Sequence, residues 1–412
     1  MRFVPVRLTE AVVPARLGSR FRWLLSSTIV NNLGDGVSLA AGPLLVASLT
    51  RDPFLVSMSL MAQWLPMLIF GIFGGAIADR VDRKRMVIVV NLGRAVVLLT
   101  LVAVIVAGAV NIAFVLIVLF VLGASETFSD SASSTLLPAV VARQDLGVAN
   151  ARMQGAFLLA NQLVAPPIGA ALFAAGMALP FAANAAAFAL GALLISRIAG
   201  SMRSERAEVA GMWADMGEGI RWLIAHPAMR TLALTIFAFN VTYGAAWGVL
   251  VLYASDRLGL GEVGFGLLMT ATAVGGVVGT VSYGTLERRF SLANLLRLGL
   301  LLETAMHLVL ALTAVPLVAM AMLVAWGAGV FVWGTIATVI RQRAVPNALL
   351  GRVTGVYRVA SVGGLVIGAP LGGLLATAFG ITAPFWFGFV GSAVLVTLLW
   401  RRFVQVAHAG EA

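Results

Sequence analysis

The stretch Gly75-Ala76-Ile77-Ala78-Asp79-Arg80-Val81-Asp82-Arg83-Lys84-Arg85 carries six charged side chains at the point where two long apolar segments meet. The flanking segments, 55–78 and 86–109, are each long enough to cross the roughly 30 Å hydrocarbon core of a bilayer as a helix. Irregular, charged backbone is not stable in contact with lipid, so the quoted stretch is expected to be a tight turn at a membrane face. Its four cations place that turn on the cytoplasmic side.

The composition is that of an integral membrane protein. The 412 residues are 60% hydrophobic and 11% charged, with a mean hydropathy of +1.00, whereas soluble proteins are about 25% charged. The chain has no cysteine and three widely spaced histidines, so we expect neither a metal site nor a cofactor. The clustered histidines or paired carboxylates that an integral-membrane enzyme needs are not found in the sequence, and we expect no enzyme.

The net charge of +11 would also suit a nucleic-acid-binding protein, but its distribution argues against one. When the chain is divided into twelve helices, every Lys and Arg except Arg51 and Arg257 is assigned to one membrane face or its vicinity. This positive-inside pattern predicts a cell (inner) membrane protein with both termini in the cytoplasm. Anionic lipid headgroups account for the basic charge, and no nucleic-acid partner is expected.

Hydropathy predicts an all-α membrane protein of twelve transmembrane helices in two six-helix bundles. The expected segments are a cytoplasmic tail (1–22), an N-terminal bundle (23–198), a cytoplasmic linker (199–229), a C-terminal bundle (230–400) and a second tail (401–412). The expected helices lie near 23–48, 55–78, 86–109, 112–137, 154–175, 180–198, 230–254, 263–285, 292–314, 316–340, 353–377 and 382–400. In the linker, apolar residues at helical spacing predict an amphipathic surface helix. Those residues are Trp213, Met216, Ile220, Leu223 and Ile224.

The two halves share short matches at a nearly fixed offset, which indicates a duplication. Together with the hydropathy pattern, the matches favour two related bundles with a binding site between them. The matches are Asp79-Arg80 with Glu287-Arg288, Pro138 with Pro346, and Gly176-x-x-x-Pro180 with Gly380-x-x-x-Pro384.

The pattern Gly-x-Ile-Ala-Asp-Arg-x-x-Arg-Lys at 75–84 resembles the signature loop between helices 2 and 3 of the major facilitator superfamily. Asp82 stands where that pattern has glycine. Residues 34–38 and 351–373 resemble its multidrug and siderophore exporters, and 165–170 resembles a degraded antiporter signature. The resemblance implies a monomeric secondary active transporter that exports bulky amphiphilic small molecules in exchange for protons. It also implies that helices 1, 4, 7 and 10 line the central cavity.

Two intramembrane carboxylates are the candidates for proton coupling and substrate binding. Asp35 lies near the middle of the first predicted helix and Glu126 near the middle of the fourth. An ionisable side chain in the bilayer is costly and therefore indicates a function. Loss of hydration favours the neutral form of such a carboxylate, which makes it a usable proton carrier. The alternative is that both side chains only hold neighbouring helices together by hydrogen bonds.

Weakly polar and aromatic side chains on the cavity helices are further candidates for substrate contact. Asn240, Tyr243 and Trp247 recur at helical spacing, and an aromatic wall of this kind suits amphiphilic compounds. Ordinary packing and interfacial anchoring are the alternative for the tryptophans. The remaining candidates are Asn31, Trp326 and Trp333 on cavity helices, together with Gln63 on the second helix and Asn161 and Gln162 on the fifth. Glu303 and His307 share a face of the ninth helix, which is peripheral in the family, and a packing role is expected for them.

The resemblance also implies a conformational latch at the cytoplasmic side. Asp130 would pair with Arg83, and Asp79 would cap the start of the eleventh helix when that side is closed. Gly75 and Arg80 complete the set of predicted latch residues.

The source of energy is constrained by the absence of a phosphate-binding loop. Lys84 is the only lysine and lies in Arg-Lys-Arg, so no Gly-Lys-Ser/Thr motif is encoded. Energy must come from a gradient or from another subunit. An importer or uniporter of the same fold and a non-transporting membrane receptor or scaffold remain open as alternatives.

Overall fold

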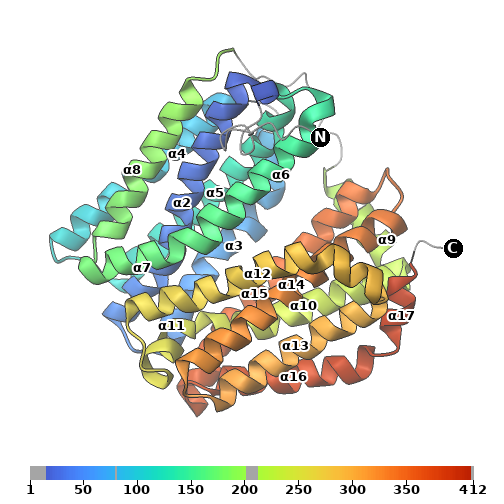
Figure 1. The fold of residues 1–412 in the computed structure, drawn as a ribbon. Helices are drawn as coiled ribbons and strands as arrows, with labels where there is room; N and C mark the ends of the chain where they lie inside the picture. The colour runs from blue at the N-terminus through green and yellow to red at the C-terminus, as the bar shows by residue number, and fades with distance from the viewer. Residues whose placement is uncertain (1–14, 79–80, 201–211, 410–412) are drawn as a thin grey trace, which may run out of the picture. The chain divides into compact units, whose positions relative to one another are not determined.

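The computed structural model describes residues 15–78, 81–200 and 212–409, with side chains described except at 15, 72–78, 134–135 and 212–215. The described residues are almost entirely helical and contain no strand (Figure 1). The chain divides into two compact units, Met1–Ala41 with Ile69–Glu208 and Gly42–Leu68 with Val209–Ala412. The segment Gly42–Leu68, which the sequence analysis places in the N-terminal bundle, thus packs with the second unit.

The first eight elements carry the chain from the N-terminal tail to the linker. They are α2 (Gly18–Leu49), α3 (Pro53–Ala78), α4 (Arg83–Val106), α5 (Ile112–Val140), α6 (Leu146–Ala156), the π-helical segment η3 (Phe157–Val164), α7 (Ala165–Ala175) and α8 (Leu179–Ser196). Short 3₁₀ turns, Ala15–Leu17 and Arg143–Asp145, precede α2 and α6.

The remaining elements belong to the second unit. They are α9 (Met212–Ala225), α10 (Pro227–Gly248), α11 (Leu250–Leu252), the π-helical turn η4 (Tyr253–Arg257), α12 (Glu262–Arg289), α13 (Leu292–Leu312), α14 (Pro316–Ala344), α15 (Leu350–Phe379), α16 (Ala383–Leu399) and α17 (Arg402–Ala407).

The described residues include ten helices that are long and apolar enough to cross a membrane. The pair α9 and α10, which is bent by 107°, gives an eleventh span if it is counted as one, and α16 is a shorter apolar helix. The all-α membrane fold is confirmed. These helices are consistent with the twelve predicted runs.

Asp82 determines where α4 begins. Its carboxylate accepts a hydrogen bond from the backbone N–H of Arg85 at 3.0 Å, which is the N-cap arrangement. The φ of Asp82 is −66°, so this position does not need the conformational freedom of glycine. The departure from the family pattern therefore stabilises the start of the helix.

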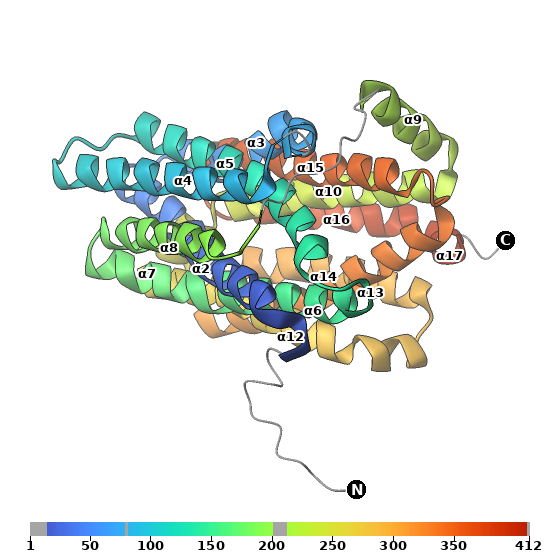
Figure 2. The ribbon, with the colours of Figure 1, turned by 90° about the horizontal axis from the view of Figure 1, so that it is seen from above.

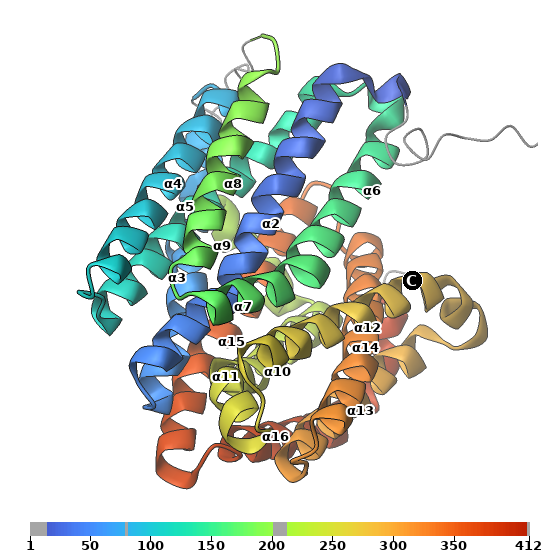
Figure 3. The ribbon, with the colours of Figure 1, turned by 60° about the vertical axis from the view of Figure 1, so that its left-hand side comes forward.

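Glycines let helices approach closely within each unit. In α15, Gly364, Gly368 and Gly372 follow one another at four-residue spacing, and each lies against the backbone of α10. A Cβ at any of them would collide with that backbone. This is the small-residue packing typical of membrane helices. The close pairs α12 with α14 and α4 with α8 run side by side in the ribbon (Figures 2 and 3).

One of the sequence matches between the halves corresponds to equivalent turns. Gly176 ends α7 and accepts from the N–H of Leu179, and Gly380 ends α15 and accepts from the N–H of Ala383. A proline lies in the first turn of the helix that follows in both cases. By contrast, Pro138 lies inside α5, whereas its match Pro346 follows the end of α14.

The linker contains the predicted helix, α9. Leu223 is buried in the core of the second unit, and Glu218 forms an ion pair with Arg352 of α15. Ile220 and Ile224 are exposed. Residues 201–211 lie outside the described part of the chain, so the rest of the predicted linker is not tested.

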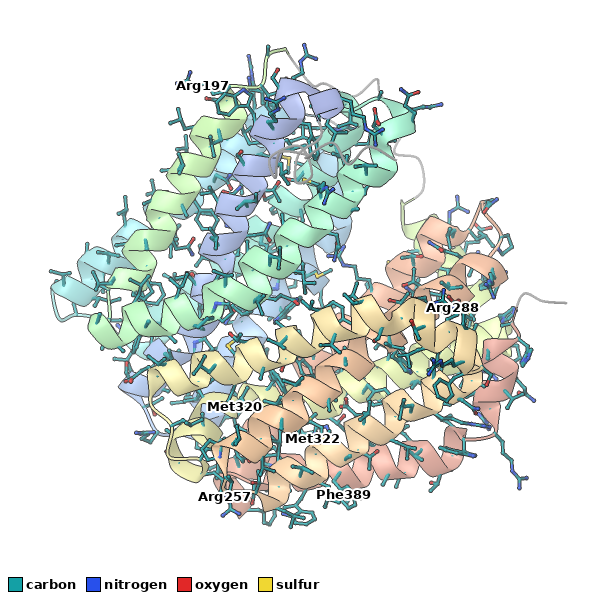
Figure 4. The ribbon with its side chains drawn as sticks, viewed as in Figure 1. Arg197, Arg257, Arg288, Met320, Met322 and Phe389 are labelled. Atoms are coloured by element: carbon teal, nitrogen blue, oxygen red, sulfur yellow. The ribbon has the colours of Figure 1, made fainter. Side chains whose placement is uncertain are left out.

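One cation, Arg94, departs from the predicted sidedness. Arg257 ends the turn η4 that precedes α12, and Arg288 lies in the last turn of α12 (Figure 4). Arg94, which was assigned to the vicinity of the cytoplasmic face, is the twelfth of the 24 residues of α4. Because α4 begins at Arg83, this arginine lies in the middle of the span.

Gly372→Ala should destabilise the protein by about 1–3 kcal/mol, because the added methyl group forces α15 away from α10. Gly355→Ala in the same helix is the control, since a Cβ there meets nothing within 4 Å, and Ala favours helix by up to about 1 kcal/mol. The melting temperatures of the purified variants in detergent should therefore shift in opposite directions. Equal shifts would contradict the packing argument.

Candidate functional site

An ion pair between Asp35 and Arg94 lies in the middle of the first unit. Arg94 Nη2 of α4 is 2.5 Å from Asp35 Oδ1 of α2. The arginine side chain is 3% exposed and the aspartate side chain 18%. A guanidinium stays protonated in proteins, so a carboxylate must remain near it in an apolar surrounding.

Glu126 of α5 is the second carboxylate at this site. Its Oε2 lies 4.0 Å from Arg94 Nη2, and its side chain is 50% exposed. Asp130, one turn further along α5, is close enough to Asp35 for their charges to interact. The structure thus brings together both predicted proton-coupling residues. We call Asp35, Arg94 and Glu126 the charge triad.

Two glycines beside Asp35 let α2 approach its neighbours. Gly34 lies against the Asn184 side chain of α8, and Gly36 lies against the backbone of Asn161 in η3. Asn184 in turn donates a hydrogen bond to the Ser38 hydroxyl. The sequence Gly-Asp-Gly therefore holds the aspartate on a helix whose flanks are tightly packed.

Arg94 is also held by an aromatic ring. Its guanidinium carbon lies 4.1 Å from the centroid of the Phe188 ring of α8, a cation–π contact. Arg94 Nε and the whole side-chain amide of Asn91 are buried and have no hydrogen-bond partner among the described residues. The interior of this unit is therefore polar beyond the three charges.

The other predicted polar residues of the first unit lie at helix contacts. Asn31 faces Gly191 of α8, and buried Asn161 donates from Nδ2 to the Asn32 carbonyl oxygen at 3.3 Å. Asn161 and half-buried Gln162 belong to the π-helical segment η3. Pro166 and Pro167, in the first turn of α7, lack the N–H groups that would hydrogen-bond to carbonyl oxygens of η3. Such segments are frequent at functional sites.

In the second unit, Tyr243, Trp247 and Trp326 form one aromatic cluster. The ring centroids are 4.5 Å apart for Tyr243 and Trp247, 5.4 Å for Tyr243 and Trp326, and 5.1 Å for Trp247 and Trp326. Tyr243 and Trp247 are half-buried, whereas Trp326 is buried. We call these three residues the aromatic cluster.

The remaining candidates of this unit make local or packing contacts. Asn240 donates to the Ile236 carbonyl oxygen and to the Ser361 hydroxyl of α15. Trp333 is buried in the hydrophobic core, with its ring edge-on to Phe239 at 6.0 Å. Gln63 donates to the Ser59 carbonyl oxygen in its own helix. Their predicted substrate contacts stay predictions.

The predicted latch falls largely outside the described residues. Asp79 and Arg80 are not described, and neither are the surroundings of Gly75 in α3. Arg83 is the first residue of α4, and Asp130 is exposed on α5. Their pairing stays a prediction.

Sequence reasoning did not single out Arg94. The signal was present, because a polar pair, Asn91 and Arg94, interrupts an otherwise apolar run at the spacing of one helical turn. Among the described residues, no group of three or more His, Asp or Glu side chains is placed to hold a metal ion.

Long apolar helices that enclose a buried ion pair define a polytopic membrane protein of the transporter class. A family model described as "Transmembrane secretion effector" matches residues 10–411. The chain therefore belongs to this family of the major facilitator superfamily.

Curated relatives of similar length are efflux pumps. The chain is 30% identical over 377 residues to the multidrug efflux pump Tap of Mycolicibacterium fortuitum. The aligned region covers 88% of this chain and 90% of that protein. It is 26% identical over 413 residues to the enterobactin exporter EntS of Escherichia coli O1:K1 / APEC, with 93% of both covered.

Solved structures share the fold. A bacterial homologue of the iron transporter ferroportin in its inward-facing state matches with a TM-score of 0.74 at 18% identity, covering 94% of this chain and 98% of that one. A point mutant of the nucleoside transporter NupG matches with a TM-score of 0.74 at 11% identity, covering 94% and 100%. At these identities the likeness concerns the fold alone.

Asp35→Asn and Glu126→Gln should each be tolerated, because the other carboxylate still compensates Arg94. The double variant should lose about 3 kcal/mol more than the sum of the single losses, since it leaves a buried charge uncompensated. Melting temperatures of the purified variants measure this coupling.

The triple variant that adds Arg94→Gln is the control for this coupling. It removes the uncompensated charge, and we expect it to recover most of the stability that the double variant loses. Additive losses without recovery would show that the two carboxylates do not share Arg94.

Proposed function

We propose that the protein is a secondary active exporter of bulky amphiphilic small molecules, drug-like or siderophore-like, which it exchanges for protons by alternating access. We propose that it acts as a monomer in the cell (inner) membrane with both termini in the cytoplasm. The efflux pumps among its relatives support the direction of transport. The charge triad is the observation that carries the proposal of proton exchange.

The net charge of the charge triad supports the exchange of a proton for a cationic substrate. With both carboxylates ionised, the triad holds two negative charges and the single positive charge of Arg94, which leaves one excess negative charge; exposed Asp130 of α5 lies outside this count. One proton or one monovalent cationic group neutralises this excess. The two therefore compete for the same site, which is the requirement for exchanging one for the other.

Arg94 can transmit the protonation of Asp35 in α2 to Glu126 in α5. When Asp35 takes up a proton, it ceases to be a counterion, and the guanidinium must then rely on Glu126, 4.0 Å away. In this scheme the proton is held on an Asp35 oxygen. The accompanying shift of Arg94 between α2 and α5 is the local event that biases the transport cycle.

The aromatic cluster suits the apolar part of an amphiphilic substrate. Three ring faces within contact distance provide a large apolar surface with a Tyr hydroxyl group beside it. Leu60 and Met61 of α3 pack with the same cluster. We propose that this surface binds the ring system of the substrate.

Asp35→Asn should abolish pH-driven transport, because the amide cannot carry the proton. The measurement is uptake of rhodamine 6G into vesicles that contain the purified protein and have an acidic interior. Uptake should fall to the level of protein-free vesicles. Glu262→Gln, at an exposed carboxylate in the first turn of α12, is the matched control and should transport normally.

Two outcomes would overturn the assignment of Asp35. Undiminished pH-driven uptake by the Asp35→Asn variant would remove it from the proton path. A wild-type protein that moves dye only down its own gradient would show that no proton exchange occurs.

Glu126→Gln should separate coupling from transport. Because Asp35 still compensates Arg94 in this variant, we expect dye-for-dye exchange between the two sides of the vesicle to persist. Stimulation of uptake by the pH gradient should be lost or strongly reduced. Stimulation equal to that of the wild type would exclude Glu126 from coupling.

A further inference from the structure

A second buried acid–base pair lies in the second unit. Glu303 and His307 are one turn apart on α13, and Glu303 Oε1 lies 3.1 Å from His307 Nε2. The side chains are 6% and 0% exposed, respectively. The second carboxylate oxygen of Glu303 accepts a hydrogen bond of 2.5 Å from the indole Nε1–H of Trp326. The carboxylate therefore connects the imidazole to the aromatic cluster.

One of the two ring nitrogens of His307 is not used in the contact with Glu303. Its Nδ1 is buried and has no hydrogen-bond partner among the described residues. Gly388 of α16 lies directly against this side of the ring, where a Cβ would collide with it. The ring is thus fixed with Nε2 toward the carboxylate, and the bare Nδ1 is the atom that can gain a proton.

The two protonation states of the pair differ in net charge. With one hydrogen on Nε2, a neutral imidazole faces an ionised carboxylate, and the pair carries one negative charge. A proton taken from water onto Nδ1 makes the pair neutral overall. The two states therefore place different charges beside the indole N–H of Trp326.

We propose that Glu303 and His307 form a second exchangeable proton site, separate from Asp35, whose charge is sensed by the aromatic cluster through Trp326. The part that this site plays in transport rests on the proposed function, but its proton binding does not. Loss of the proton places a negative charge beside the indole N–H of a ring that stacks on Tyr243 and Trp247.

The groups around the pair leave it electrostatically isolated. Within the described residues, the hydrogen-bonding and ion-pairing partners of Glu303 and His307 are each other and Trp326. From α10, Tyr243 is close enough to Glu303 for their charges to interact. Arg297 of α13 binds the Trp400 carbonyl oxygen two turns nearer the start of the helix. The charged and titratable residues at the ends of α12 and α14 and around α17 are Glu262, Glu287, Arg288, Arg289, Arg341, Arg343, Arg401, Arg402 and His408.

Near-UV circular dichroism of the purified full-length protein tests this proposal, because stacked aromatic rings report on charge and hydrogen bonding beside them. All proteins carry His226→Gln, because the His226 ring stacks on Trp222 and would add its own signal. Between about pH 5 and about pH 8, the range in which His titrates, the otherwise wild-type protein should show a one-proton transition. The Glu303→Gln variant keeps an acceptor for the indole N–H, and it should lack the transition. The His307→Gln variant should also lack it, whereas Asp35→Asn and Glu262→Gln should retain it.

The outcomes separate this proposal from the proposed function. A transition that persists in Glu303→Gln, or a wild type without one, would overturn it. If His307→Gln does not fold, Glu303→Gln decides the matter, provided that its far-UV spectrum and elution volume match the wild type. A transition with the expected dependence on these variants, in a protein that moves no dye, would support the proton site and contradict the proposed function.

Discussion

The charge on Arg94 is the constraint on which the first unit depends. A guanidinium in the middle of a membrane span cannot be neutralised by losing its proton, so a carboxylate must remain within reach of it. Asp35 does so at 2.5 Å, and Phe188 covers the cation from α8. Because Asp35, Arg94 and Phe188 lie on three different helices, this one requirement fixes how α2, α4 and α8 are rotated about their axes.

Close helix packing makes this arrangement possible. Gly34 and Gly36 remove the side chains that would hold α2 away from α8 and η3. In hydrocarbon, burial of apolar surface contributes little free energy to helix association, so small residues and polar contacts drive the packing of the helices. Glycines allow the same close approach of helices in the second unit, at the α10–α15 contact. The sequence Gly-Asp-Gly at 34–36 is thus both a packing motif and the position of the carboxylate that pairs with Arg94.

Much of the fold follows from sequence because the bilayer restricts the choices. Apolar runs of about 20 residues must be helices, and an intramembrane carboxylate such as Asp35 or Glu126 is conspicuous in them. Arg94 was missed because hydropathy alone placed it near the cytoplasmic end of its run, before the cap at Asp82 was known. Periodicity also cannot separate Trp326, which belongs to the aromatic cluster, from Trp333, which lies in the core. That distinction depends on tertiary packing.

The two units share a duplicated turn but not the same charge chemistry. Gly176 and Gly380 end α7 and α15 with the same hydrogen-bonded turn, as the predicted duplication requires. The first unit contains a permanent cation with two carboxylates, so only its carboxylates can change the net charge. The second unit contains a buried carboxylate that pairs with an imidazole instead of a guanidinium. Under the proposed proton exchange, the two units would therefore respond through different groups, even though the helices around them are arranged by the same packing rules.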